Sequence, residues 1–131
     1  MPRKPRDVTE AELSVLQLLW ERQEATARTL AEELYGGATE SNLATVQKLL
    51  QRLETKCFVK RSRELRPHVF APAIGREELV SLRLQSTAED LCSGSFSPLL
   101  THLVKSRLTR SERQELRDLL EKLEREHSTE Q

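Results

Sequence analysis

The sequence predicts a mainly α-helical protein with one small β-hairpin, and three observations carry this prediction. Residues 42–55 contain an apolar stripe with the i, i+3, i+4, i+7 spacing of an α-helix, formed by Val46, Leu49, Leu50 and Leu53. Directly downstream, residues 58–59 and 68–70 have strand composition and flank a polar, proline-containing connection. Leucine-rich helical patterns follow residue 74. The order indicates a winged helix-turn-helix with a helical segment behind it.

The elements before residue 42 complete the helix-turn-helix. Thr9 and Glu12 form a capping box that begins a helix running to about Arg22, with Trp20 as a core residue. Residues 23–25 are short enough to add a third strand to the wing sheet. Thr26 caps a second helix over residues 27–35, which Gly36 ends because glycine accepts the left-handed conformation. Residues 38–41 are then the turn, and Asn42 is the expected N-cap of the recognition helix, 43–56.

Local charge favours nucleic acid as a partner of this helix and hairpin. The 131-residue chain has no net formal charge, but residues 41–68 carry seven cations against two carboxylates, a net charge of +5. The polar face of the helix holds amides and cations, which are the side chains that contact base edges and phosphates, while Glu54 lies beside the buried stripe. The candidate DNA-binding residues are Asn42, Ala44, Thr45, Gln47, Lys48, Gln51, Arg52, Lys60, Arg61, Arg63 and Arg66.

Within this set, each side chain has an expected role. Gln47, Lys48 and Gln51 are candidates for base contacts. Ala44 allows close approach or meets a thymine methyl, whereas Thr45 and Arg52 hold phosphates with help from the amides at the helix N-terminus. The basic residues of the hairpin would grip the flanking backbone.

The segment after residue 73 predicts dimerisation. Its helices are expected over 76–91, from Ser97-Pro98, and from the Thr109–Glu112 capping box to about Glu126. About 50 residues are too few to hide all of its leucines within one small unit. An isologous partner would cover Leu99, Leu100, Leu103, Leu116, Leu119, Leu120 and Leu123. The alternative is that these helices fold back on the winged domain. The expected domains are 1–73, with a flexible basic arm at 1–7, and 74–131.

Other classes of protein find little support in the composition. His68, His102 and His127 are scattered, the two cysteines are far apart, and no phosphate loop or nucleophile motif occurs, so we expect no enzyme, metal or cofactor. No apolar run approaches the ~18 residues of a membrane span, and no h-region follows the basic N-terminus. We therefore expect a cytoplasmic protein that does not insert into membranes.

The motifs in their order resemble one family of bacterial regulators. They are Thr9-Glu10-Ala11-Glu12-Leu13-x-Val15-Leu16, Leu19-Trp20, Thr45-Val46, Leu50-x-Arg52-Leu53, Lys56-x-Phe58-Val59, Val69-Phe70-Ala71-Pro72 and Arg76-Glu77-Glu78. Between about Val8 and Leu123 the chain resembles the penicillinase-repressor and methicillin-resistance-repressor family, which also includes copper-responsive repressors. The resemblance implies a dimeric repressor with an N-terminal winged helix, a C-terminal dimerisation segment and a palindromic operator.

The chain departs from that family in two respects. Cys57 stands where the family usually has glycine, so a left-handed backbone there would cost about 1 kcal/mol and rearrange the helix end slightly. In antibiotic-responsive members, a membrane sensor peptidase leads to cleavage of an Asn-Phe bond in the dimerisation segment. The resemblance places His102-Leu103 at that bond, so the region matches but the bond does not. The cysteine cluster of the copper-responsive members is absent, since no cysteine follows Cys92.

These observations favour a homodimeric, sequence-specific transcriptional repressor that binds double-stranded DNA at a palindromic operator. Its partners would be the operator, a second copy of the chain and, by resemblance, a sensor peptidase system. Two alternatives stay open. One is a protein-interaction module built on a winged-helix scaffold, and the other is an architectural protein that binds DNA without sequence specificity.

Overall fold

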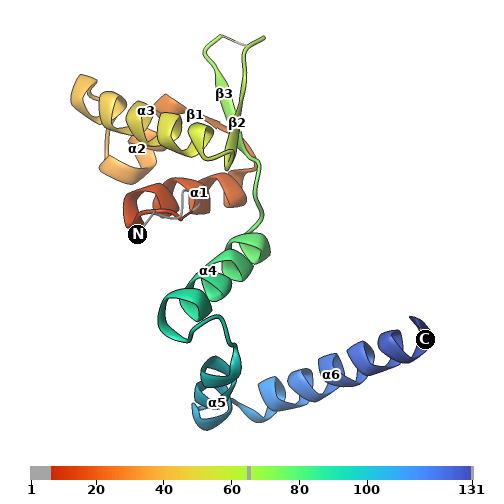
Figure 1. Cartoon of the computed structure of the whole chain (residues 1–131). Helices are drawn as coiled ribbons and strands as arrows, with labels where there is room; N and C mark the ends of the chain where they lie inside the picture. Colours follow the sequence, from red (N-terminus) through yellow and green to blue (C-terminus); the bar gives the residue numbers. More distant parts are fainter. Residues whose placement is uncertain (1–6, 65, 131) are drawn as a thin grey trace. The chain divides into compact units, whose positions relative to one another are not determined.

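The structure is a computed structural model that describes residues 7–64 and 66–130, with the side chains of all but the last two of these. The expected basic arm falls mostly on residues 1–6, which lie outside the described residues. By internal contacts the chain divides between Ser86 and Thr87 into two compact units. The elements in chain order (Figure 1) are α1 Glu10–Arg22, β1 Ala25–Thr26, α2 Ala27–Tyr35, α3 Glu40–Thr55, β2 Val59–Ser62, β3 Val69–Pro72, α4 Arg76–Leu91, α5 Ser97–Lys105 and α6 Arg110–Glu130.

The first unit contains α1, α2, α3, the first turns of α4 and a three-stranded antiparallel sheet of order β1-β3-β2. Strand β3 is central, because Phe70 pairs with Ala25 of β1 on one side and with Arg61 of β2 on the other. The β2–β3 hairpin projects past α3 (Figure 1). This arrangement confirms the predicted winged helix-turn-helix. The hairpin strands begin one residue later and extend further than predicted, because Phe58 belongs to the turn that ends α3.

Local signals in the sequence set the ends of the first two helices. The Thr9 hydroxyl accepts from the Glu12 N–H at 3.2 Å, and the Glu12 carboxylate accepts from the Thr9 N–H at 2.8 Å, so the predicted capping box is present. Thr26 caps α2 by accepting from the Thr29 N–H at 3.2 Å. Gly36 ends α2 with φ +81°, the left-handed conformation that glycine adopts at little cost.

The core of this unit lies where α1, α2 and α3 meet the sheet. Its members are buried aliphatic residues and two phenylalanines: Val15, Leu16, Leu19, Leu30, Ala31, Val46, Leu49, Leu50, Leu53, Phe58, Val59 and Phe70. The prediction that Trp20 plugs the core is wrong in part, since its ring is only half-buried at the core edge. Trp20 Nε1 donates to the Ile74 carbonyl at 2.8 Å, and the Arg76 guanidinium lies 4.7 Å from the ring centroid. Trp20 therefore ties α1 to the chain that leaves β3.

The compact first unit extends past residue 73. Ile74 and Leu79 are 4 % exposed and belong to the same core cluster as α1 and α3. Arg83 of α4 donates to the Val8 carbonyl at 3.2 Å and lies 3.5 Å from the Asp7 carboxylate. The division at 73/74 expected from the sequence thus lies inside a compact unit, and the first turns of α4 pack with the winged helix.

The second unit includes α5 and α6. Helix α6 begins with the predicted capping box, in which the Thr109 N–H donates to Glu112 at 2.9 Å and the Glu112 N–H donates to Thr109 at 3.1 Å. The helix continues to Glu130 rather than ending near Glu126, because no glycine or proline interrupts the chain there. Its leucines occur at i, i+3, i+4 and i+7, and three of them, Leu119, Leu120 and Leu123, are about half exposed in this chain.

Candidate nucleic-acid interface

Helix α3 begins earlier than the sequence predicted. The expected N-cap, Asn42, is wrong: the helix starts at Glu40, and the Thr39 hydroxyl caps it by accepting from the Asn42 N–H at 3.1 Å. Asn42 Nδ2 instead donates to the Gly37 carbonyl at 2.8 Å. Threonine is also a good N-cap residue, and Thr39 takes the cap three residues before the expected position. The Asn42 amide therefore fixes the turn between α2 and α3.

The polar face of α3 is open to solvent as predicted. All six of its candidate residues are exposed: Ala44, Thr45, Gln47, Lys48, Gln51 and Arg52. In the part of the chain that the structure describes, no carboxylate pairs with Lys48 or Arg52. The Thr45 hydroxyl donates to the Ser41 carbonyl at 3.1 Å, so a phosphate contact would require this hydroxyl to turn.

The C-terminal end of α3 is fixed by a charge pair that reaches into the core. Lys56, the C-cap residue, donates from Nζ to Glu12 Oε1 at 2.8 Å and to the Asp7 carbonyl at 2.7 Å. The Glu12 side chain is 1 % exposed, and its second oxygen, Oε2, has no partner among the described residues. Desolvation acts to raise the pKa of Glu12, but the hydrogen bonds from Lys56 and Thr9 and the Lys56 charge outweigh it, so the pKa lies below its ordinary value.

The residue after this cap adopts the left-handed conformation. Cys57 has φ +67°, its N–H donates to the Glu54 carbonyl at 3.0 Å, and the Phe58 N–H donates to the Leu53 carbonyl at 2.9 Å. These two bonds form a Schellman motif, with the side chains of Leu53 and Phe58 fully buried beside it. The expected rearrangement of the helix end is absent. The departure from glycine is accommodated by strain at Cys57 alone.

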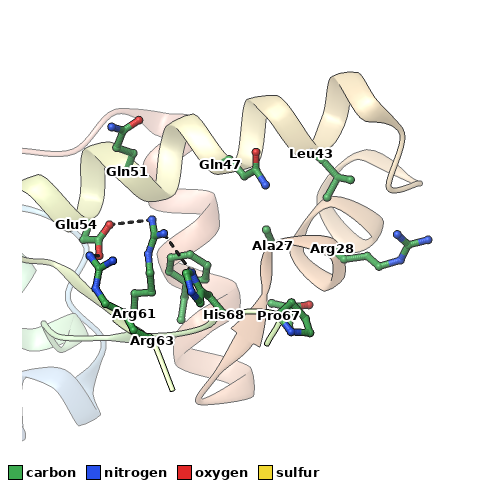
Figure 2. Close-up of a pocket in the computed structure, with 12 residues that line it drawn as sticks. Ala27, Arg28, Leu43, Gln47, Gln51, Glu54, Arg61, Arg63, Pro67 and His68 are labelled. Carbon is green, nitrogen blue, oxygen red and sulfur yellow. Dashed lines mark hydrogen bonds and ion pairs between the residues drawn. The ribbon is translucent and has the colours of Figure 1, made fainter. Parts of the chain in front are cut away.

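A groove of about 780 Å³ separates α3 from the wing and the start of α2. Gln47, Gln51 and Glu54 line this groove from successive turns of α3, and Figure 2 shows Glu54 facing Arg61 and Arg63 of the wing, with His68 beside Arg61. The structure thus brings two predicted base-contacting amides together with two predicted wing arginines. The other seven candidates do not line this groove: Asn42, Ala44, Thr45, Lys48 and Arg52 on α3, Lys60 on β2 and Arg66 in the wing.

Glu54 lines the groove, whereas the sequence placed it beside the buried stripe and outside the candidate DNA-binding residues. Its Oε1 accepts from Arg61 Nη2 at 3.0 Å, and its Oε2 lies 3.7 Å from Arg63 Nη2. The Glu54 side chain is 26 % exposed and that of Arg61 is 24 % exposed, whereas that of Arg63 is 72 % exposed. Spacing could have identified Glu54, because Gln47, Gln51 and Glu54 stand at i, i+4 and i+7 and share a helix face. The wing arginines that it meets could not be placed from spacing.

Arg61 is held from three sides. Besides the Glu54 carboxylate, its guanidinium lies 4.9 Å from the Phe70 ring centroid and its Nη1 lies 3.3 Å from His68 Nδ1. Arg66 Nη1 lies 3.2 Å from the other ring nitrogen of His68. Desolvation, followed by the charges of Arg66, Arg61 and Arg63, lowers the pKa of His68, against a smaller opposing effect of Glu54. The lowered pKa favours the neutral form of His68 in this arginine-rich wing.

The seven cations counted from the sequence are not equivalent in the structure. Lys56 pairs with Glu12, and Arg61 and Arg63 pair with Glu54. Lys60 on β2 is exposed, and no carboxylate pairs with it or with Arg66 among the described residues. The cations that stay available for phosphates are Lys48, Arg52, Lys60 and Arg66.

Two other features bear on the class of protein. Residues 7–64 and 66–130 contain no group of three or more His, Cys, Asp or Glu side chains arranged to hold a metal ion. Among these same residues, none of the helices combines the length and apolar character needed to cross a bilayer.

The two residues that the family resemblance aligns with the cleaved bond, His102 and Leu103, lie within helix α5 and are exposed.

The fold and the exposed face of α3 beside a basic wing define a winged helix-turn-helix regulator of transcription. A family model described as penicillinase repressor matches residues 8–122. The chain is 35 % identical over 117 residues to the transcriptional regulator BlaI of Mycobacterium tuberculosis, covering 88 % of this chain and 84 % of that protein. It therefore belongs to the penicillinase repressor family, whose members are transcriptional repressors and not enzymes.

Two further similarities were found. The methicillin resistance regulatory protein MecI of Staphylococcus aureus is 24 % identical over 123 residues, covering 93 % of this chain and 99 % of that protein. Among solved structures, a mutant MarR from E. coli complexed with operator DNA aligns with a TM-score of 0.47 and 23 % identity, covering 91 % of this chain and 77 % of that one.

Proposed function

We propose that this protein is a homodimeric, sequence-specific repressor that binds a palindromic DNA operator through α3 and the wing. The observation that carries the proposal is the joint surface of α3 and the hairpin. Exposed Gln47 and Gln51 stand on the same groove as the wing arginines, in a chain of the penicillinase repressor family. A helix with exposed amides beside a basic hairpin suits a major groove flanked by phosphates.

Sequence specificity is proposed to come from α3. Gln47 and Gln51 project from successive turns of the helix (Figure 2), and an amide can bind adenine through two hydrogen bonds in the major groove. Lys48, one residue after Gln47, adds a cation that has no carboxylate partner among the described residues. Ala44 lies a turn earlier and has no bulk to keep the helix from the base edges.

Affinity is proposed to come from cations around this helix. Arg52 of α3, Lys60 of β2 and Arg66 of the wing are exposed and lack carboxylate partners in the described part of the chain. Each phosphate contact that such residues make releases counterions and adds to the salt dependence of binding. Asn42, which fastens the turn before α3, would act by holding the helix N-terminus in place rather than through a base contact.

Dimerisation is proposed to occur through the helices that follow residue 73, chiefly α5 and α6. Large apolar side chains of both helices are 44–58 % exposed in this chain, namely Leu100, Leu103, Leu119, Leu120 and Leu123. Exposed leucines at helical spacing on a single chain indicate a missing partner. A second copy provides the same stripe in an isologous interface and would hold two winged helices about 10 bp, or a multiple of it, apart on DNA.

Two further parts of the proposal concern regulation and location. The sensor peptidase that the family resemblance implies stays a prediction, and the exposed His102-Leu103 pair at the aligned position differs from the Asn-Phe bond. A helical bond must unfold locally before a protease can bind it, so cleavage within α5 would require such opening. A repressor of this kind would act in the cytoplasm, where a bacterial chromosome lies.

Footprinting of the full chain on the DNA upstream of its own gene tests the proposal. We expect one protected palindrome with two half-sites related by an integral number of helical turns. Sedimentation of the complex should show two chains for each site. Uniform protection would support an architectural DNA-binding protein instead, and no protection at any concentration would support a protein-interaction module.

A further inference from the structure

The groove between α3 and the wing contains a carboxylate where phosphate-binding residues would be expected. Glu54 lies within ion-pair distance of two arginines, at 3.0 Å from Arg61 and 3.7 Å from Arg63, and Figure 2 shows both guanidinium groups turned toward it. The side chains of Glu54 and Arg61 are 26 % and 24 % exposed, so the contact between them is partly shielded from water, whereas Arg63 is 72 % exposed. Partial shielding strengthens ion pairs compared with contacts on an open surface.

We propose that Glu54 is a positioning residue that sets the ratio of specific to non-specific DNA binding by holding Arg61 and Arg63 away from phosphates. This inference rests on the proposed DNA-binding function of α3 and the wing. In the free protein, Arg61 and Arg63 would be paired with Glu54. Lys60 and Arg66 would then be the wing cations that contact the phosphates of DNA of any sequence. Arg61 and Arg63 would then contact phosphate only at the cost of leaving Glu54.

Non-specific binding should be more sensitive to this arrangement than operator binding. Binding to DNA of any sequence comes almost entirely from phosphate contacts, so a carboxylate that occupies two arginines weakens it directly. Operator binding has the additional base contacts proposed for Gln47 and Gln51, which stand on the same helix face as Glu54. The ion pairs also tie β2 to α3, which keeps the wing in register with those amides.

The position of Arg61 supports this role over a simple surface salt bridge. Its guanidinium lies over Phe70 of β3 and beside His68, while its Nε atom is buried without a hydrogen-bond partner among the described residues. Arg61 is therefore packed into the base of the wing and lacks the freedom of a surface side chain. Arg63 is more exposed and is the arginine that a phosphate would reach first.

The experiment compares Glu54→Gln with the wild-type full chain on two duplexes of equal length, one carrying the footprinted operator and one with a scrambled sequence. We expect about fivefold tighter binding of Glu54→Gln to scrambled DNA near 0.1 M salt, because one negative charge is lost within about 4 Å of two cations. The salt dependence on scrambled DNA should steepen by about one unit of log–log slope. Operator affinity should change by less than about twofold, so the specificity ratio falls.

The matched control is Glu64→Gln, which removes the same charge from the wing at an exposed residue with no ion pair among the described residues. Glu54→Asp keeps the charge but shortens the side chain by one methylene and lengthens both arginine contacts, so its binding to scrambled DNA should fall between that of wild type and that of Glu54→Gln. The effect of Glu54→Gln should also vanish when Arg61 and Arg63 are both replaced by Gln. A persistent effect there would overturn the proposal, because Glu54 would then act by charge alone.

Other outcomes also decide the question. Equal effects of Glu54→Gln and Glu64→Gln would overturn the proposal. The proposal would also be overturned if Glu54→Gln bound both duplexes equally more weakly and melted at a lower temperature, since Glu54 would then only stabilise the fold. If the wild-type chain itself does not prefer the operator duplex, the proposed function fails instead, and the two failures are therefore distinct.

Discussion

Replacing Lys56 with methionine tests how the recognition helix is anchored. The substitution keeps most of the side-chain volume and removes the charge that pairs with Glu12. The Glu12 carboxylate, 1 % exposed, would keep only the Thr9 N–H as a donor, at 2.8 Å. Removing one partner of a buried ion pair costs about 3–5 kcal/mol, because the remaining charge is desolvated without compensation. The Lys56 side chain is 23 % exposed, so water can approach, and we expect about 3 kcal/mol.

Urea unfolding of the full chain at neutral pH and fixed protein concentration measures this loss. The control is Glu12→Gln, which keeps a capping-box residue at the third helical position and removes the fully buried charge; Lys56, which is 23 % exposed, keeps its hydrogen bond to the Asp7 carbonyl. We expect Glu12→Gln to cost about 1.5 kcal/mol, the lower end of the range for a hydrogen bond to a charged group. The double variant should resemble Glu12→Gln alone. If Lys56→Met and Glu12→Gln cost the same, the Glu12 charge is not desolvated and the reasoning is wrong.

The pH dependence gives a second check on the same pair. The pKa of Glu12 is lowered in the folded protein, so the unfolded state binds its proton more readily. The stabilisation is therefore present above the ordinary carboxyl pKa of 4.5 and is lost as the pH falls through the lowered folded value. In Lys56→Met, burial should raise the pKa of Glu12. The folded state of this variant then binds the proton more readily than the unfolded state, so lowering the pH should increase its stability. The stability gap between wild type and variant should narrow below about pH 5.

Three further predictions concern the proposed DNA-binding dimer. Gln47→Ala or Gln51→Ala should cost about 1–3 kcal/mol on the operator and little on scrambled DNA; an equal loss on both would exclude base contacts. Lys60→Ala should weaken binding to every sequence and reduce the salt slope by about one, and an unchanged slope would remove β2 from the interface. Leu120→Glu should give monomers in sedimentation and weak operator binding, because it places a charge in the α6 stripe; a variant that stays dimeric would place the interface elsewhere.

Elements with strong local signals were predicted closely from sequence. Helix α2 spans Ala27–Tyr35 and α4 spans Arg76–Leu91, with the predicted ends, because a capping threonine and a glycine mark α2 and flanking glycines mark α4. The start of α3 was misplaced by three residues, since Thr39 and Asn42 are both good caps. The choice between them depends on the path of the chain after Gly36, which is a tertiary property.

The pairing of the charged groove residues was missed, whereas the exposure of the α3 amides was predicted. Helical spacing alone places Gln47 and Gln51 on a polar face, and their role in base contacts stays a prediction. Lys56 was counted as a patch cation because its partner, Glu12, lies 44 residues earlier in the chain. Glu54 was set aside because the two arginines that meet it come from the β2–β3 hairpin, whose register no helix pattern determines. Counting charges in the sequence therefore overestimated the number of cations available for phosphates, since a count does not show which arginines and lysines are paired with carboxylates.

Cys57 provides a prediction about stability that is independent of DNA. At φ +67° a residue with a Cβ is strained by about 1–2 kcal/mol, which Cys57→Gly would relieve. Glycine also adds freedom to the unfolded chain, which costs about 0.5–1 kcal/mol. The net gain should therefore be about 0.5–1 kcal/mol in urea unfolding, with the Leu53–Phe58 hydrogen bond unchanged. Cys57→Ala keeps the Cβ and serves as the control, with an expected change near zero. Equal stability of the Gly and Ala variants would mean that the Schellman turn carries no such strain.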